Sequence, residues 1–68
     1  MKNIIKVERA RHNLTQAELA EKVKVARQTI IAIEAGRFVP STMLAFKIAK
    51  ILNCKTDDLF ELEEKDWL

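Results

Sequence analysis

Two helix patterns separated by only three residues constrain the fold of this chain more than any other feature of its sequence. The first starts at Thr15-Gln16-Ala17-Glu18, a capping box in which the Thr15 hydroxyl accepts from the Glu18 amide and the Glu18 carboxylate accepts from the Thr15 amide. An apolar stripe at helical spacing follows, formed by Leu19, Ala20 and Val23. We therefore expect a helix over residues 16–23, followed by the break Lys24-Val25-Ala26.

A second helix is expected over residues 27–35, directly after this break. Ile30 and Ile33 face inward, and Gly36 supplies the left-handed residue with which many helices end. Apolar periodicity and capping or first-turn signals predict three further helices, at about 3–12 with Asn3 as N-cap, at about 42–52 with Ser41 as N-cap, and a short one from Thr56. The sequence thus predicts an all-α fold, a compact five-helix bundle.

The chain has 68 residues, which is enough for one domain. A domain of this size buries a modest share of its surface, so dimerisation would add to a small stability margin. We expect the folded domain to span residues 1–61 and the acidic stretch 62–68 to form a tail. The alternation in Phe60-Glu61-Leu62-Glu63 leaves three readings of this end: a short strand, packing across a dimer interface with the fifth helix, or a frayed terminus.

The inventory of reactive side chains argues against an enzyme or a metal protein. With a single His (His12) and a single Gly, the chain lacks the residues for a catalytic site or a phosphate-cradling loop. The one cysteine, Cys54, has no second thiol or ligand for a redox or metal sensor. We expect no catalytic residue, no metal and no cofactor. Neither a signal peptide nor an apolar run of the ~18–20 residues that span a bilayer is visible, so a cytoplasmic protein is expected.

Positive charge is concentrated in the first part of the chain. Residues 1–37 carry eight Lys and Arg against four Glu, whereas residues 38–68 carry four Lys against six acids. A basic half beside an acidic half is typical of a protein with one face directed at phosphates. Scattered surface charge would give the same numbers, so charge alone leaves both readings open.

Several stretches together resemble the phage-repressor type of helix-turn-helix regulator, the Xre/Cro family. The motif runs through Leu14 to Val23, Val25 to Ile30 and Ile33 to Gly36, and the stretches Pro40-Ser41, Leu44 to Ala49 and Asp58 to Phe60 match the compact single-domain subgroup. The resemblance covers roughly residues 3–61. It implies a lambda-repressor-like DNA-binding domain, double-stranded DNA as ligand and usually a symmetric dimer. The helix at about 27–35 would be the recognition helix, which enters the major groove.

The leading end of this helix carries side chains that can read base edges. Arg27 can donate to guanine O6 and N7 or to a phosphate, and Gln28 can pair with adenine N6 and N7. Ile31 is expected to point outward, where it can contact a thymine methyl group. We therefore expect Arg27, Gln28 and Ile31 to contact bases. The plain alternative for all three is an ordinary solvent-exposed helix face.

Contacts to the DNA backbone are expected on either side of the recognition helix, where they position it without reading sequence. In the resembling family the glutamine that matches Gln16 holds the backbone, and the free amides at this first helical turn favour an anion. The resemblance also implies that Arg37 makes a second contact to the DNA backbone, supported by Phe38. Two further candidates are Thr29 on the helix and Lys24 in the turn.

The resemblance also implies a structural ion pair between Arg9 and Glu34. It would join the first helix to the end of the recognition helix, because the planar guanidinium binds a carboxylate at two points. The role of the pair would be to orient the recognition helix, and Glu34 would not face DNA.

The sequence departs from the family pattern at four positions. Lys24 stands where Gly is usual, so a left-handed Lys24 costs roughly 1 kcal/mol. Ala26 replaces a Ser or Thr cap, a loss of about 0.5–2 kcal/mol. Glu8 stands where many relatives have Leu, which affects the packing of the first helix. Lys55 stands where a capping Ser is common, so we expect Thr56 to cap one residue later.

Together these features predict a sequence-specific DNA-binding transcriptional regulator, namely a repressor that binds a near-palindromic operator as a homodimer. Four apolar residues near the C-terminal end are candidates for the dimer interface: Leu59, Phe60, Leu62 and Trp67. The alternative is an antitoxin, or another protein-interaction module built on the same bundle, whose partner surface matters more than DNA.

Overall fold

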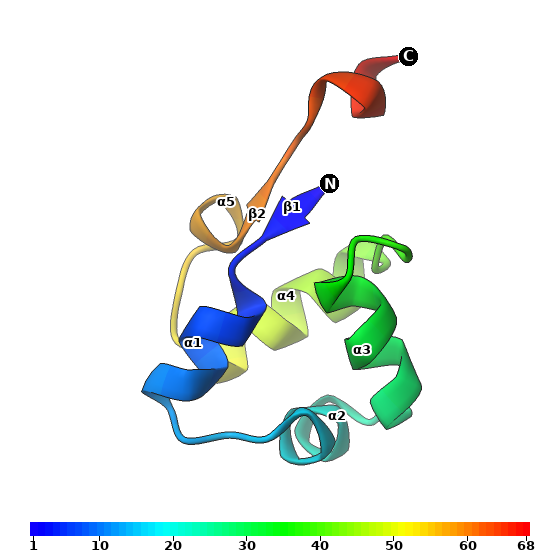
Figure 1. Cartoon of the computed structure of the whole chain (residues 1–68). Coiled ribbons are helices and arrows are strands. Elements are labelled where there is room, and N and C mark those ends of the chain that lie inside the picture. Colours follow the sequence, from blue (N-terminus) through cyan, green and yellow to red (C-terminus); the bar gives the residue numbers. More distant parts are fainter.

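The computed structural model describes residues 1–68 as a bundle of five helices with a small sheet beside it (Figure 1). In chain order the elements are β1 (Lys2–Asn3), α1 (Ile5–Arg11), α2 (Gln16–Val23), α3 (Arg27–Glu34), α4 (Thr42–Ile51), α5 (Thr56–Leu59), β2 (Phe60–Glu61) and the 3₁₀ turn η1 (Glu64–Trp67). The predicted five-helix, essentially all-α architecture is therefore confirmed.

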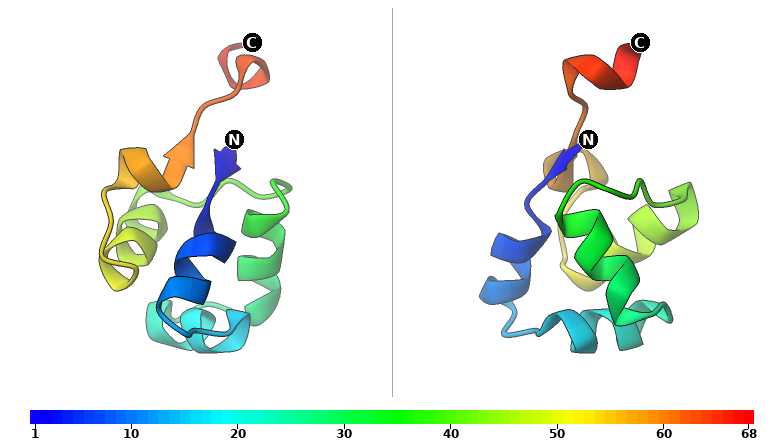
Figure 2. Two further views of the ribbon diagram at one scale, coloured as in Figure 1. Left: turned by 60° about the vertical axis from the view of Figure 1, so that its left-hand side comes forward. Right: turned by 45° about the vertical axis from the view of Figure 1, so that its right-hand side comes forward.

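One apolar core, to which every helix contributes, holds the bundle together. Its buried side chains are Ile5, Leu19, Ala20, Val23, Ile30, Ile33, Ile48, Ala49, Leu52, Leu59 and Phe60. α2 packs against both α3 and α4, and Figure 2 shows it closing one end of the bundle. Full burial of a large aliphatic side chain contributes about 1.5–3 kcal/mol, so packing rather than propensity stabilises such short helices. None of the helices has the length and apolar composition needed to cross a bilayer.

The local signals around α2 and α3 act as predicted. The Thr15 hydroxyl accepts from the Glu18 amide at 3.0 Å, and the Thr15 amide donates to the Glu18 carboxylate at 2.9 Å. Lys24 ends α2 in the left-handed conformation (φ 61°, ψ 46°), and Gly36 follows α3 with φ 77°. Ala26 precedes α3 without a side-chain cap, since its methyl group cannot accept a hydrogen bond.

α1 begins two residues later than predicted, and Asn3 is not its N-cap. Ile4 occupies the N-cap position, because Asn3 pairs in β1 and its backbone is extended. The Asn3 side chain still serves the helix, since its Oδ1 accepts from the Ile5 amide at 3.2 Å. Its Nδ2 donates to the Ile33 carbonyl at 2.9 Å, near the end of α3. Asn3 thus connects β1 and the start of α1 to the end of α3.

The two ends of the chain meet in the antiparallel sheet, where Lys2 pairs with Glu61 and Asn3 with Phe60. Of the three readings of the C-terminal end, a short strand is correct for Phe60–Glu61. The residues after it extend away from the bundle and form η1 (Figure 1, Figure 2). Leu59 and Phe60 are 1% and 9% exposed within their own chain. Of the four candidates for a dimer interface, these two thus pack in the core of their own chain, whereas Leu62 and Trp67 are exposed.

Two unusual residues of the sequence are accommodated in different ways. Lys55 takes the N-cap position of α5 without a side-chain cap, so the predicted shift of the cap to Thr56 does not occur. Glu8 is buried on α1, and its Oε2 lies 3.3 Å from Nε of Arg11, one turn further on.

Burial raises the pKa of the Cys54 thiol, and the nearby charges of Glu8 and Asp58 raise it further. Cys54 is therefore held in its uncharged thiol form at neutral pH.

Candidate DNA interface

α3 has a buried face and an exposed face. Ile30 and Ile33 are buried in the core, whereas Arg27 and Gln28, at the N-terminal end of the helix, are exposed. Ile31 and Ala32 are half-buried. The two long polar side chains are thus free at the end of the helix that approaches base edges in a recognition helix, and Ile31 offers a smaller apolar surface beside them.

A largely buried ion pair fixes α3 to α1. The guanidinium of Arg9 binds the Glu34 carboxylate at two points, with Nε donating to Oε2 at 2.7 Å and Nη2 donating to Oε1 at 3.2 Å. Its Nη1 donates to the Leu14 carbonyl at 2.9 Å, in the connection between α1 and α2. Arg9 therefore holds three segments together, and Glu34 is directed at α1 rather than outward. This is the contact that the family resemblance implied.

Gln16 joins the same network from the first turn of α2. Its Nε2 donates to Oε1 of Glu34 at 3.3 Å, and the side chain is half-buried. The predicted backbone clamp is therefore engaged within the protein. Because the hydrogen bond is long, turning the Gln16 amide toward a phosphate would give up about 0.5–1.5 kcal/mol, which a charge-assisted contact can offset.

A surface hollow of ≈ 600 Å³ lies beside Gln16, between the start of α2 and the start of α3. It is lined by Arg9, Leu14, Thr15, Gln16, Ala17 and Arg27. The guanidinium of Arg27 thus lies near the first turn of α2, where helical amides carry partial positive charge. No acidic side chain lines the hollow. Its chemistry suits a phosphate group.

The other predicted backbone contacts lie at both ends of α3. Lys24 is exposed in the turn before the helix, and Arg37 and Phe38 are exposed in the loop after it. The Arg37 amide donates to the Ala32 carbonyl at 2.9 Å, which fastens this loop to the helix. Thr29 is half-buried and offers less surface. All five side chains are thus at least partly accessible, and Gln16 alone among them has a side-chain partner within the protein.

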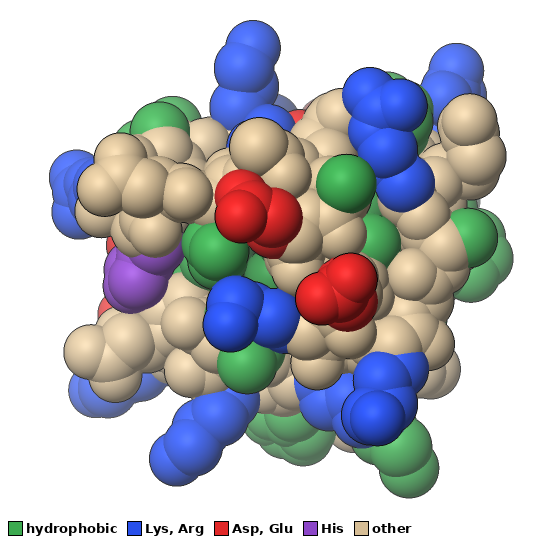
Figure 3. Space-filling view, turned by 90° about the horizontal axis from the view of Figure 1, so that it is seen from below, with side chains coloured by type: hydrophobic (Ala, Val, Ile, Leu, Met, Phe, Trp, Pro, Cys, Tyr) green, Lys and Arg blue, Asp and Glu red, His purple; other side chains and the backbone are tan.

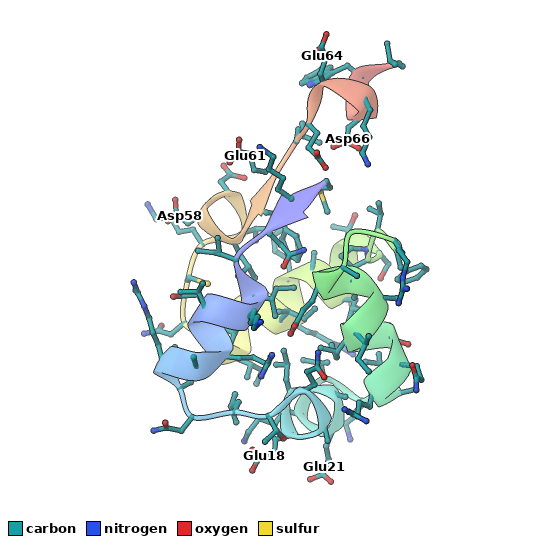
Figure 4. The ribbon with its side chains drawn as sticks, in the orientation of Figure 1. Glu18, Glu21, Asp58, Glu61, Glu64 and Asp66 are labelled. Atoms are coloured by element: carbon teal, nitrogen blue, oxygen red, sulfur yellow. The ribbon has the colours of Figure 1, made fainter.

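Apart from Glu34, which is paired with Arg9, α3 carries no acidic side chain. Figure 4 shows Glu18 and Glu21 pointing outward from α2, on the side opposite the bundle, and Asp58, Glu61, Glu64 and Asp66 at the far end of the molecule. Hydrogen bonds from Thr15, first from its backbone amide, lower the pKa of Glu18, so this carboxylate stays charged and caps α2. Seen from below, the bundle carries Lys and Arg around its periphery (Figure 3). Acidic side chains lie in the middle of this face, so positive charge surrounds it without covering it (Figure 3).

Asn3 is the positioning residue that sequence reasoning missed. A polar residue directly before an apolar helix start indicates an N-cap, which is the role that we predicted. Nothing in the local sequence indicates that the same side chain donates to Ile33, thirty residues away. Together with Arg9, it holds α3 from the side opposite its exposed face.

A capped helix, a tight left-handed turn and a second helix that is exposed at its leading end define a helix-turn-helix DNA-binding protein. The chain matches the helix-turn-helix family HTH_3 over residues 5–59, and it belongs to this Xre/Cro-like family. Similar proteins described as HTH-type transcriptional regulators occur in Methanocaldococcus jannaschii (56% identical, 97% of this chain and 100% of the relative), in Bacillus subtilis (YgzD; 50%, 97% and 100%) and in Archaeoglobus fulgidus (46%, 97% and 93%). The protein is a DNA-binding transcriptional regulator, a class without enzymatic activity.

Proposed function

We propose that this regulator is a homodimeric repressor that binds a near-palindromic operator, with α3 in the major groove. The observation that supports this most directly is the exposure of Arg27 and Gln28 at the leading end of α3. In a symmetric dimer, two such helices enter successive major grooves, about 34 Å or 10 base pairs apart. Occupation of a promoter by the dimer then excludes polymerase.

The proposed contacts fall into two groups. Arg27, Gln28 and Ile31 read bases, because they lie on the accessible part of α3. The second group, which holds phosphates and fixes the register of the helix, consists of Gln16, Lys24, Thr29, Arg37 and Phe38. The hollow beside Gln16 would take one phosphate on the α2 side of the groove, and Arg37 would take another on the α4 side.

Selection of bound sequences from random duplexes tests base reading. The wild-type protein should select an inverted repeat. Gln28→Ala should lose the preference at one base position in each half-site, since a bidentate contact discriminates by about 1–3 kcal/mol. Lys55→Ala is the control, because Lys55 is exposed at the start of α5 and should leave the consensus unchanged. An unchanged consensus for Gln28→Ala would show that other residues read the operator.

Salt titration and transcription test the remaining parts. Removal of a phosphate contact by Arg37→Ala should weaken binding to all sequences alike and reduce the slope of log K against log salt by about 0.9. In vitro transcription from a promoter that contains the selected site should fall as protein is added. Stimulated transcription would contradict the assignment as a repressor while leaving DNA recognition intact.

A further inference from the structure

A groove between α2 and α4 is lined by apolar and positively charged side chains. Its volume is ≈ 350 Å³, and its lining consists of Val23, Phe46, Ile51 and four lysines: Lys22, Lys24, Lys47 and Lys50. None of these lysines forms an ion pair, and no acidic side chain lines the groove. Phe46 is 59% exposed, so its ring offers an apolar surface that a partner can cover.

The charge pattern is visible from below the bundle. In the lower part of Figure 3, Lys and Arg side chains flank hydrophobic ones. Of the residues assigned to DNA contact, only Lys24 lies on this groove. The groove therefore fits an occupant that presents an apolar or aromatic group with carboxylates next to it.

The tail of this same chain, Leu62–Leu68, has that chemistry. Trp67 is 77% exposed, and Leu62 and Leu68 are exposed as well. The tail carries three acids against one lysine: Glu63, Glu64, Asp66 and Lys65. Residues three apart eclipse one another in a 3₁₀ turn, so Glu64 and Trp67 share one side of η1. One side of the turn thus offers an indole and a carboxylate together.

The tail does not occupy the groove of its own chain. Pairing of β2 with β1 fixes the start of the tail at the end of the molecule that lies opposite α2 (Figure 1, Figure 4). From there the chain runs away from the bundle, and ion pairs from the Met1 amino group to Glu63 (2.9 Å) and Asp66 (3.2 Å) hold it in place (Figure 1). An occupant of this chemistry therefore comes from a second molecule.

We propose that the tail of one protomer binds the α2–α4 groove of a second copy, and that the exchange is reciprocal. Trp67 covers the ring of Phe46, and Glu64 lies among the groove lysines, Lys50 included. Because the groove adjoins α2 and the tail extends from the β1–β2 end of the molecule, reciprocal exchange places the two copies antiparallel, about a two-fold axis across the long dimension. This inference rests on the homodimer of the proposed function and assigns its interface.

Charge reversal with compensation tests the contact. Sedimentation equilibrium of the full chain should show that Lys50→Glu raises the dimer Kd about tenfold, because each substitution acts at both symmetric contacts. Glu64→Lys should do the same, and the chain with both substitutions should recover most of the wild-type affinity. Lys6→Glu, an exposed lysine on α1, is the matched control and should leave Kd unchanged. Both target side chains are exposed, so these variants should fold normally.

A direct contact can be observed in a mixture of isotope-labelled and unlabelled chains. Isotope-filtered NMR should show intermolecular NOEs between the Trp67 indole and the Phe46 ring. A wild-type chain that stays monomeric, or a dimer with no such NOEs and no response to charge reversal, would overturn the proposal. The groove would then be open to an acidic partner of another kind.

DNA binding by the same samples separates this inference from the proposed function. On a duplex with a single half-site, Lys50→Glu should keep the base preference that depends on Gln28. On the inverted repeat, it should lose only the extra affinity that dimerisation provides. If the wild type lacks a Gln28-dependent preference, the proposed DNA reading fails. If Lys50→Glu and Glu64→Lys both bind the inverted repeat like the wild type, only the tail–groove interface fails.

Discussion

The molecule contains two capping boxes with different outcomes. The first, Thr15 with Glu18, begins an α-helix of eight residues. The second, Glu63 with Asp66, has the same reciprocal hydrogen bonds but begins a 3₁₀ turn of four residues. α2 buries three side chains in the core, whereas η1 buries none. The comparison shows that a capping box determines where a helix can begin, and that apolar packing determines whether the helix continues.

The same contrast distinguishes the part of the molecule that reads DNA from the part that we propose for dimerisation. α2 and α3 are held by the core and by the Arg9–Glu34 pair, so the exposed end of α3 is presented by a rigid support. The tail is attached through a sheet of two residues per strand and through ion pairs from the Met1 amino group to Glu63 and Asp66. Its apolar side chains are exposed, so the loss of one of them should scarcely affect the folding of the monomer.

The largest expected effect on stability is loss of a core side chain from α2. Leu19→Ala should lower the free energy of unfolding by about 2–5 kcal/mol, because Leu19 is fully buried and its removal leaves a cavity. The matched change in the tail, Leu62→Ala, should cost less than about 0.5 kcal/mol in the monomer. Urea denaturation followed by circular dichroism at low protein concentration measures both. Equal losses would show that the tail packs on its own bundle.

The second effect concerns the ion pair behind α3. Arg9→Ala should cost about 2–4 kcal/mol, since it leaves the Glu34 carboxylate largely buried without its partner and removes the bond to Leu14. It should also weaken DNA binding, because α3 loses its support. Arg9→Met combined with Glu34→Leu is the control and should restore much of the stability. A double variant as unstable as Arg9→Ala alone would indicate that the charges themselves stabilise the fold.

The sequence predicts those features whose causes lie within a few residues. The Thr15 cap, the left-handed Gly36 and the Ser41 cap of α4 follow from side-chain chemistry at adjacent positions. The left-handed Lys24 follows only from the family pattern, which usually has Gly there. The Arg9–Glu34 contact was available only through the family resemblance. The pairing of Asn3 with Phe60 could not be predicted at all. It depends on how the two ends of the chain meet after folding, and local periodicity does not report on such contacts.

A third prediction compares the starts of α2 and α3. Thr15→Ala should destabilise the protein by about 0.5–2 kcal/mol, because it removes the hydroxyl that accepts from the Glu18 amide. Ala26→Ser should stabilise it by about 0.5–1 kcal/mol, because α3 has no side-chain cap. Thermal denaturation of the two variants measures both signs. No gain from Ala26→Ser would mean that the turn backbone does not allow the serine to reach the helix amides.

The smallest effect concerns the pH response of the two boxes. Hydrogen bonds from Thr15 lower the pKa of Glu18, the amino group of Met1 lowers that of Glu63, and the Glu63 amide lowers that of Asp66. Because the folded state favours the charged form in each case, this stabilisation is fully present above the ordinary carboxyl pKa, about 4. It is lost as the pH falls through the lowered values.

The two boxes should nevertheless respond differently to acid. The amide signals of η1 should lose their ordered chemical shifts in an acid titration followed by ¹⁵N NMR, because no apolar burial holds this turn once its carboxylates are protonated. The first turn of α2 should weaken but remain helical, since Leu19 still anchors it in the core. Glu18→Gln, which keeps the shape of the side chain without its charge, should remove the pH response at Thr15 only. If both boxes melted together, the cap rather than the packing would control the length of each element.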